Sequence, residues 1–334
     1  MTRMNLFRLR FFPWMFSWVL ALWPMTLPAA PGSGISSQTS PTRAQTTAAK
    51  PAAKKTAPQK PAAKKPPAAP AVPRKPSLAR EPYLGAIVVD ASNGRILFEQ
   101  RADAQGYPAS VLKLMLLLIT MEQIQAGQLS LQDEVPVSAR AVSREGANLQ
   151  LREGEAFTVE SMLFALMIHS ANDVALAMAE KLGGSLEGYL EISNRRAREL
   201  GMENSRFHSA SGLGPKDPAG PYDITTPREL TLLCREVLKY PDALRFTSAR
   251  KKLFRPEGND SFRMETHNYI LDSVQGCDGL KTGYIRVAGY CIAGTAERKG
   301  RRVIVVVLGA TSEKSRNQHA AALIEKGFAA LEAP

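Results

Sequence analysis

Strand-forming segments stand at both ends of residues 81–334, and helix-forming segments fill the sequence between them. The turn sequence Ser92-Asn93-Gly94 joins two short apolar or alternating segments, which predicts a β-hairpin. Near the end of the chain the apolar residues follow an extended rather than a helical period. This arrangement predicts an α+β domain: one antiparallel sheet, flanked by helices, with an inserted helical region. The predicted strands span 84–90, 95–100, 276–285, 288–297 and 301–308.

Apolar runs with recognisable end signals predict the helices. The clearest start is Thr226-Pro227-Arg228-Glu229, a capping box with proline at the first helical position. Gly127, Gly183-Gly184 and Gly201 each follow an apolar run, where glycine commonly ends a helix. The predicted helices span 110–125, 159–168, 172–182, 185–200, 226–239 and 314–331, the last of them an amphipathic core helix.

Residues 31–80 differ in composition from the rest of the chain. They consist mainly of Ala, Pro, Lys, Ser and Thr, and Lys-Pro-Ala-Ala-Lys-Lys occurs at 50–55 and again at 60–65. Such a segment has too little apolar surface to fold. We expect a disordered, extended linker that tethers the domain formed by 81–334. The alternative is a basic strip that also contacts anionic cell-wall polymer or lipid headgroups.

Residues 1–30 have the order of an export signal, because three arginines precede an apolar run from Phe11 to Pro28. Pro31 directly after Ala29-Ala30 is a poor context for cleavage, so a cleaved signal peptide and an uncleaved signal anchor both stay open. In either case we expect an exported protein, in the periplasm or at the outer face of the cytoplasmic membrane. Any attachment to the membrane is expected to reside in this N-terminal segment.

The positive charge of the chain is confined to its first part. The formal net charge is +12, but residues 1–80 hold 13 of the 43 basic residues and none of the 31 acidic ones. The remaining residues are therefore close to neutral, which removes the main support for nucleic-acid binding. Three cysteines and four histidines are scattered without metal-ligand spacing, so the sequence predicts no metal site and no cofactor.

Ser110 and Lys113 form a Ser-x-x-Lys pattern at the start of an apolar helix. Side chains at i and i+3 share a helix face, so the Lys113 amine can reach the Ser110 hydroxyl. The apolar run 114–119 would bury this amine and lower its pKa towards that of a general base, which would activate Ser110 as a nucleophile. Taken alone, Ser110 fits an ordinary helix N-cap better than a nucleophile. A second Ser-x-x-Lys occurs at Ser248 and Lys251, but no Ser-x-Asn lies between it and Lys281, so we discard that pair.

Two further short motifs offer polar groups to the same chemistry. Ser170 and Asn172 are separated by one residue, so in an extended loop both point into a cleft between the helices on either side. Lys281, Thr282 and Gly283 lie on a predicted strand, where a lysine and a hydroxyl can hold a carboxylate and glycine leaves room for a substrate backbone. Taken singly, each motif has an ordinary alternative. Ser170 can be a helix cap, and Lys281 can be a strand lysine beside a flexible glycine at 283.

The order and spacing of the three motifs resemble those of penicillin-binding proteins and serine β-lactamases. The resemblance covers about residues 81 to 330. It extends to Pro108-Ala109-Ser110, the His-Ser-Ala-Asn-Asp run at 169–173, Ser211-Gly212-Leu213, the run from Asp278 to Tyr284, and Ala288-Gly289-Tyr290-Cys291. These segments look like a D-alanyl-D-alanine carboxypeptidase of the low-molecular-weight penicillin-binding proteins.

The resemblance implies a role for each candidate residue. Ser110 is the acylated nucleophile, Lys113 is its base, and the backbone N–H groups of Ser110 and Tyr284 form the oxyanion hole. The other candidates are Ser170 and Asn172 for proton transfer and substrate holding, Lys281 and Thr282 for the terminal carboxylate, and Gly283 for close approach of the substrate.

The implied activity is a serine peptidase that removes the terminal D-alanine from peptidoglycan stem peptides through an acyl-enzyme, and that β-lactams acylate. The alternatives are a D,D-endopeptidase acting on cross-links, a class A-like β-lactamase, and a non-catalytic tethered wall-binding protein. The sequence departs from some relatives at Tyr269, because His267-Asn268 is not followed by a basic residue. This departure puts auxiliary carboxylate binding at that position in doubt.

Overall fold

The computed structural model describes residues 75–217, 219–255 and 260–333. The predicted signal segment and most of the predicted linker lie outside the described residues. The Leu78 N–H donates to the Val287 carbonyl oxygen at 2.8 Å, and the Arg80 N–H donates to that of Gly309 at 3.0 Å. Contacts with the domain thus begin a few residues before the predicted boundary at 81. In the described ranges, no helix is long and apolar enough to cross a membrane.

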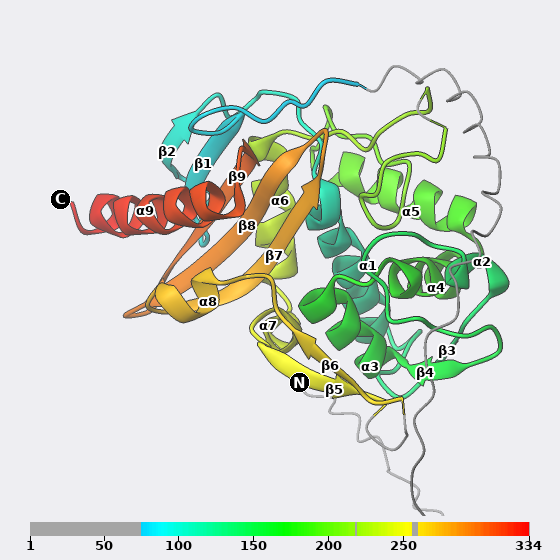
Figure 1. Ribbon diagram of the computed structural model, residues 1–334. Coiled ribbons are helices and arrows are strands. Elements are labelled where there is room, and N and C mark those ends of the chain that lie inside the picture. The colour runs from blue at the N-terminus through cyan, green and yellow to red at the C-terminus, as the bar shows by residue number, and fades with distance from the viewer. Residues whose placement is uncertain (1–74, 218, 256–259, 334) are drawn as a thin grey trace, which may run out of the picture. The chain divides into compact units, whose positions relative to one another are not determined.

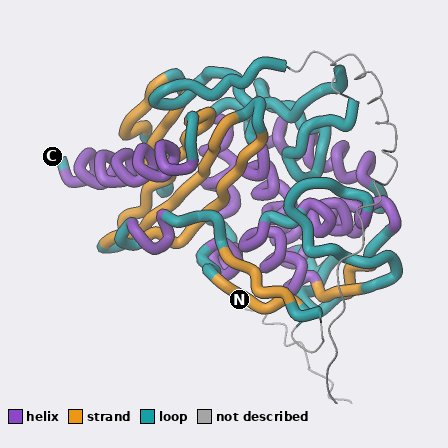
Figure 2. Tube along the Cα trace, viewed as in Figure 1, coloured by secondary structure: helices purple, strands orange, loops and turns teal. Residues whose placement is uncertain are grey.

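A five-stranded antiparallel sheet built from both ends of the domain forms its centre (Figures 1 and 2). The strand order is β2-β1-β9-β8-β7, so the first strand lies between its hairpin partner and the last strand. The predicted α+β fold and its strands are confirmed to within two residues. The strands are β1 (Gly85–Asp90), β2 (Ile96–Gln100), β7 (Cys277–Ile285), β8 (Gly289–Arg298) and β9 (Arg301–Ala310).

Strand β9 separates two apolar cores. Its side chains alternate between the two faces of the sheet, as the period of two in a strand requires. Val303, Val305 and Val307 pack with the C-terminal helix α9 (Glu313–Glu332), while Ile304, Val306 and Leu308 belong to the core shared with the other helices. Both faces are therefore buried, which explains why β9 is an almost continuous apolar run.

The helical region is built around α1 (Lys113–Gln125), in which every residue from Lys113 to Met121 is buried. This helix contacts α4, α5, α6 and α7 (Figure 1). The six predicted helices are confirmed to within two residues at their ends when two adjoining turns are counted with them, a 3₁₀ turn at 109–112 before α1 and a π-helical turn at 165–169 after α3; α7 was not predicted. The helices around α1 are α3 (Val159–Phe164), α4 (Asn172–Gly183), α5 (Leu186–Glu199), α6 (Pro227–Val237) and α7 (Pro241–Thr247).

Several short elements were not expected from the sequence. Strands of three or four residues form two small two-stranded sheets, β3 (Glu134–Pro136) with β4 (Ala156–Thr158), and β5 (Lys251–Phe254) with β6 (Phe262–Glu265). So few residues cannot display a period, and partners on other segments decide their structure. The one-turn helices α2 (Ala139–Val142) and α8 (Ile270–Ser273) are of the same kind.

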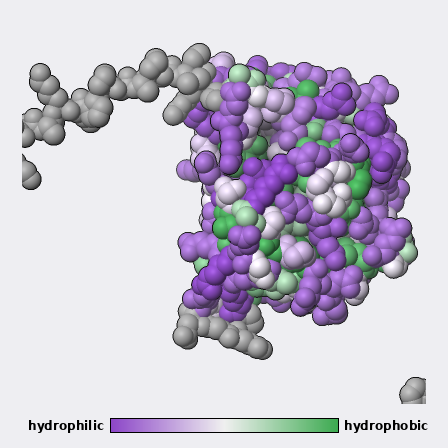
Figure 3. Space-filling view, turned by 90° about the vertical axis from the view of Figure 1, so that its right-hand side faces the viewer, coloured by the Kyte–Doolittle hydropathy of each residue, from purple (hydrophilic) through white to green (hydrophobic). Residues whose placement is uncertain are grey.

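Large apolar side chains at the surface are few and come from separate elements. Ile96, Val142, Leu253, Phe262, Tyr269 and Tyr284 are the exposed ones among the described residues. Figure 3 shows the face at the right of Figure 1, which is largely hydrophilic with apolar side chains in small areas.

The capping box predicted at the start of α6 is only half formed. The Thr226 hydroxyl accepts a hydrogen bond from the Glu229 N–H at 3.1 Å, as expected of an N-cap. The buried Glu229 carboxylate does not return to Thr226. It accepts from the Asn204 N–H, the Asn204 side-chain amide and the Ser205 hydroxyl at 2.6–2.9 Å. Glu229 therefore joins α6 to the loop after α5.

Replacing Glu229 with alanine leaves the Asn204 and Ser205 donors without their acceptor in a partly buried site. We expect a loss of about 2–3 kcal/mol in the free energy of unfolding, measured by urea denaturation. The exposed Glu191 on α5 is the matched control, and its replacement with alanine should cost less than about 0.5 kcal/mol. Equal effects of the two substitutions would show that the Glu229 contacts do not stabilise the fold.

Candidate active site

Ser110 lies on a 3₁₀ turn, η1 (Ala109–Leu112), that runs directly into α1. The residue before it, Ala109, has a φ of 48°, a backbone conformation that is uncommon outside glycine. The N-cap position is Pro108, and no side chain caps the turn, so the interpretation of Ser110 as a helix cap is wrong. Its Oγ instead lies 2.9 Å from the Nζ of Lys113.

The Lys113 amine is fully buried at the centre of the site. Besides Ser110 Oγ, its Nζ lies 2.8 Å from Asn172 Oδ1, 3.1 Å from the Ser211 carbonyl oxygen and 3.4 Å from Ser170 Oγ. Burial lowers the pKa of Lys113 well below its usual 10.5, and the nearby Lys281 cation lowers this pKa further. Asp173 and Asp223 act in the opposite direction, but burial is the larger effect.

The contacts of Lys113 fit a neutral amine. Without its third proton, the amine donates two hydrogen bonds, for which Asn172 Oδ1 and the Ser211 carbonyl oxygen are the acceptors. Its lone pair can then accept the hydrogen of the Ser110 hydroxyl. This is the arrangement of a general base beside a nucleophile.

Ser170 and Asn172 reach Lys113 from the junction between two helices. A π-helical turn, η2 (Ala165–His169), ends at Ser170, whose backbone is left-handed with a φ of 62°. The N-cap residue of α4 is Ala171, so Ser170 does not cap that helix. The Asn172 amide donates to the Glu145 carbonyl oxygen at 2.8 Å, which directs Oδ1 towards Lys113. The predicted convergence of both side chains on one cleft is therefore found.

The third motif lies on β7, which is an edge strand of the sheet. The buried Lys281 donates from Nζ to the Thr282 carbonyl oxygen at 2.9 Å. A Cβ atom at Gly283 would lie 2.7 Å from the Ser110 nitrogen, so any side chain there would collide with the nucleophile's own backbone. The requirement for glycine comes from this contact, in addition to the room for substrate expected from the sequence. Tyr284 is half exposed and stacks on Tyr290.

These segments enclose a cavity of about 460 Å³. The Ser110 side chain lies in its wall, and the two lysines are buried beside it. Ser248 and Lys251, the second Ser-x-x-Lys pair, do not line this cavity, because they lie at the end of α7 and on β5. Apart from Lys113 and Lys281, every predicted site residue lines the cavity: Ser110, Ser170, Asn172, Thr282, Gly283 and Tyr284.

Arg316 is a site residue that the sequence did not indicate. It comes from the first turns of α9, lines the cavity and is 2% exposed. Its guanidinium donates to Asn317 Oδ1 and to the His267 carbonyl oxygen, and no carboxylate in the described residues forms an ion pair with it. Together with burial, Arg316 lowers the pKa of Lys281 to about 7. Two cations therefore lie close together at one end of the cavity.

No sequence signal marks Arg316, because its triplet Ser315-Arg316-Asn317 reads as the polar start of an amphipathic helix. Only the packing of α9 against the sheet brings it near Lys281. Among the described residues, no cluster of His, Cys, Asp or Glu could hold a metal ion. Cys234, Cys277 and Cys291 are buried free thiols.

Comparisons with known proteins agree with this geometry. A family model described as D-alanyl-D-alanine carboxypeptidase matches residues 79–312. The carboxypeptidase DacF of Bacillus subtilis is 32% identical over 247 residues, which are 74% of this chain and 62% of DacF. The chain thus spans less than two thirds of the length of this relative, and the same holds for DacC of Escherichia coli, at 60%.

Two solved structures share the fold. Penicillin-binding protein D2 of Listeria monocytogenes in an ampicillin-bound form has a TM-score of 0.66 and 32% identity, covering 74% of this chain and 98% of that one. The carboxypeptidase DacD of Francisella tularensis has a TM-score of 0.69 and 25% identity, covering 78% and 73%. With the family model spanning most of the chain, this protein belongs to the D-alanyl-D-alanine carboxypeptidase family.

Proposed function

We propose that the protein is a serine D-alanyl-D-alanine carboxypeptidase that releases the terminal D-alanine of peptidoglycan stem peptides. The observation that carries the proposal is the contact of 2.9 Å between Ser110 Oγ and the buried, pKa-lowered Lys113 amine. Lys113 takes the hydroxyl proton while Ser110 Oγ attacks the carbonyl carbon between the two D-alanines. D-alanine leaves as the amine, and water then hydrolyses the ester on Ser110.

Ser170 and Asn172 complete the path of the proton and hold the substrate. Ser170 Oγ lies 3.4 Å from Lys113 Nζ, so it can pass a proton between that amine and the leaving nitrogen. The N–H groups of Ser110 and Tyr284 are assigned to the developing oxyanion. The contact of Gly283 with the Ser110 nitrogen supports this assignment, because it brings β7 and η1 backbone to backbone.

The terminal carboxylate of the substrate is assigned to the cationic end of the cavity. Lys281 and Arg316 repel one another there, and a bound carboxylate would relieve that repulsion. The Thr282 hydroxyl lies in the same wall and can donate to the carboxylate. Arg316 would thereby supply the auxiliary positive charge that the sequence lacks at Tyr269.

A β-lactam presents a reactive carbonyl and a carboxylate, so it would acylate Ser110 by the same route. The ampicillin-bound form of the Listeria relative supports this expectation. The sequence of residues 1–80 supports export, to the periplasm or the outer face of the cytoplasmic membrane. Any attachment to the membrane would reside in residues 1–30, and residues 31–80 would tether the domain. We assign no nucleic-acid partner, metal or cofactor to this activity.

Ser110→Ala removes the nucleophile without removing a helix cap. Covalent penicillin labelling and D-alanine release should both fall by more than about 10⁴-fold, while thermal unfolding stays close to that of the wild type. Ser248→Ala is the matched control, since Ser248 opens the second Ser-x-x-Lys pair, and it should keep both activities. Labelling that survives in Ser110→Ala, or disappears in Ser248→Ala, would refute the assignment.

Lys281→Ala and Arg316→Gln test the carboxylate site. Each should lose about 2–3 kcal/mol of transition-state binding for a peptide with a free C-terminal carboxylate, calculated from kcat/KM. The loss should be much smaller for the same peptide as a C-terminal amide, which carries no charge to bind. A loss of equal size on both peptides would mean that these residues do not contact the carboxylate.

The pH dependence follows from the two lysines. Lys113 must be deprotonated to act as base, so kcat/KM should rise as the pH increases through its lowered pKa. Lys281 has a pKa lowered to about 7, so above that pH its attraction for the carboxylate should be lost in the free enzyme and kcat/KM should fall. Profiles measured from about pH 5 to 10 should be bell-shaped for the free-acid peptide. For the peptide amide, kcat/KM should only rise with pH. If kcat/KM for the two peptides falls equally at high pH, this role of Lys281 is contradicted.

A further inference from the structure

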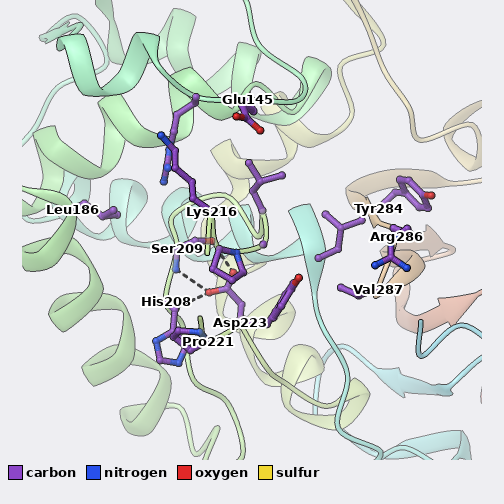
Figure 4. A pocket seen from close by; sticks show the side chains of 16 residues that line it. Glu145, Leu186, His208, Ser209, Lys216, Pro221, Asp223, Tyr284, Arg286 and Val287 are labelled. Atoms are coloured by element: carbon purple, nitrogen blue, oxygen red, sulfur yellow. Dashed lines mark hydrogen bonds between the residues drawn. The ribbon is translucent and has the colours of Figure 1, made fainter. Parts of the chain in front are cut away.

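Beside the catalytic cavity lies a second one of about 780 Å³. Figure 4 shows the residues that line this second cavity. Leu213, Tyr284 and Ile285 line both cavities, so the two are compartments of one cleft. The rest of its wall comes from the loop after α2, from Leu186 at the start of α5, from residues between 208 and 223, and from the turn between β7 and β8. The catalytic residues do not need this volume, which suggests that it accommodates another part of the substrate.

Three cationic side chains line the second cavity: Arg144, Lys216 and Arg286. None of them forms an ion pair with a carboxylate in the part of the chain that the structure describes. The Nε of Arg144 is buried and has no hydrogen-bond partner there. Figure 4 shows Lys216 and Arg286 on different walls of the cavity. This cavity therefore offers several unpaired positive charges.

Two carboxylates also line this cavity, and neither neutralises the cations by direct contact. Asp223 is buried and accepts hydrogen bonds from the His208 N–H, the Ser209 N–H and the Ser209 hydroxyl at 2.6–2.9 Å. Its oxygens are thus occupied by its own loop (Figure 4). Glu145 is exposed and lies at the rim, away from Arg286. The cations of the cavity outnumber its carboxylates and form no ion pairs with them, which favours an anionic ligand group.

The direction of β7 indicates which part of the substrate reaches this cavity. The carboxylate site is at Lys281 and Thr282, the nucleophile lies against Gly283, and Arg286 follows the end of the strand. An extended peptide advances by about 3.3 Å per residue, as β7 does. If its last residue lies beside Thr282 and its scissile bond beside Gly283, the residue before the D-alanyl pair lies beside Tyr284–Arg286.

We propose that this second cavity recognises a free carboxylate on the residue that precedes the D-alanyl-D-alanine pair of the acyl donor. This inference rests on the proposed carboxypeptidase function and adds a preference among its substrates. The cations of the cavity would form charge-assisted hydrogen bonds to that carboxylate. Lys216 and Arg286 are exposed and Arg144 is half-buried, so salt should screen this attraction.

The test compares two peptides that differ in one group, Nα-acetyl-L-glutamyl-D-Ala-D-Ala and Nα-acetyl-L-glutaminyl-D-Ala-D-Ala. The full-length enzyme should prefer the glutamyl peptide by about tenfold in kcat/KM, and added salt should reduce this preference. The double variant Lys216→Gln/Arg286→Gln should lose the preference. Lys299→Gln, in the exposed turn between β8 and β9, is the matched control and should keep it.

Equal kcat/KM values for the two peptides in the wild type would overturn the inference, as would a preference that persists in the double variant. Thermal unfolding of each variant checks that it is folded. Failure of the underlying function has a different signature, because the wild type would then release D-alanine from neither peptide and Ser110 would not be labelled by penicillin.

Discussion

The buried amine of Lys113 is the interaction on which the rest of the site depends. An amine without exposed surface must find hydrogen-bond partners inside the protein, and here they come from η1, from the junction of η2 with α4, and from Ser211. Three segments far apart in the sequence are thus held at one point. The same burial lowers the pKa of the amine, so the feature that organises the site also prepares its chemistry.

Close backbone approach is the second constraint on the nucleophile. A Cβ atom at Gly212 would lie 1.9 Å from the Ala109 carbonyl oxygen, and one at Gly283 would lie 2.7 Å from the Ser110 nitrogen. A glycine from a loop and a glycine from the edge of the sheet therefore allow their backbones to lie directly against the turn that carries Ser110. Because β7 takes its place only when the C-terminal strands pair with β1, formation of the site is coupled to completion of the sheet.

Positive charge is distributed along the cleft in excess of what the fold needs. Lys281 and Arg316 form no ion pair in the described residues. Burial lowers the pKa of Arg316, although Glu313, which lines the same cavity, acts on this pKa in the opposite direction. Arg144, Lys216 and Arg286 line the adjoining cavity. Repulsion between the buried Lys281 and Arg316 opposes folding, and a bound anion would relieve it. Both ends of a substrate with carboxylates on either side of the scissile bond would be attracted to this cleft.

The sequence by itself determined the order of strands and helices, because long apolar runs, Asn93-Gly94 and the glycines after the helices are local signals that need no partner. It also determined the eight candidate residues, through motif order and a family resemblance. The sequence did not indicate the two small sheets, the left-handed backbone at Ser170 or the hydrogen bonds of Glu229 to the loop after α5, since each depends on contacts with distant segments. Arg316 and the cationic cavity beside Tyr284 were decided only by tertiary structure, because no local pattern records which helix end or loop will face the cleft after the sheet has closed.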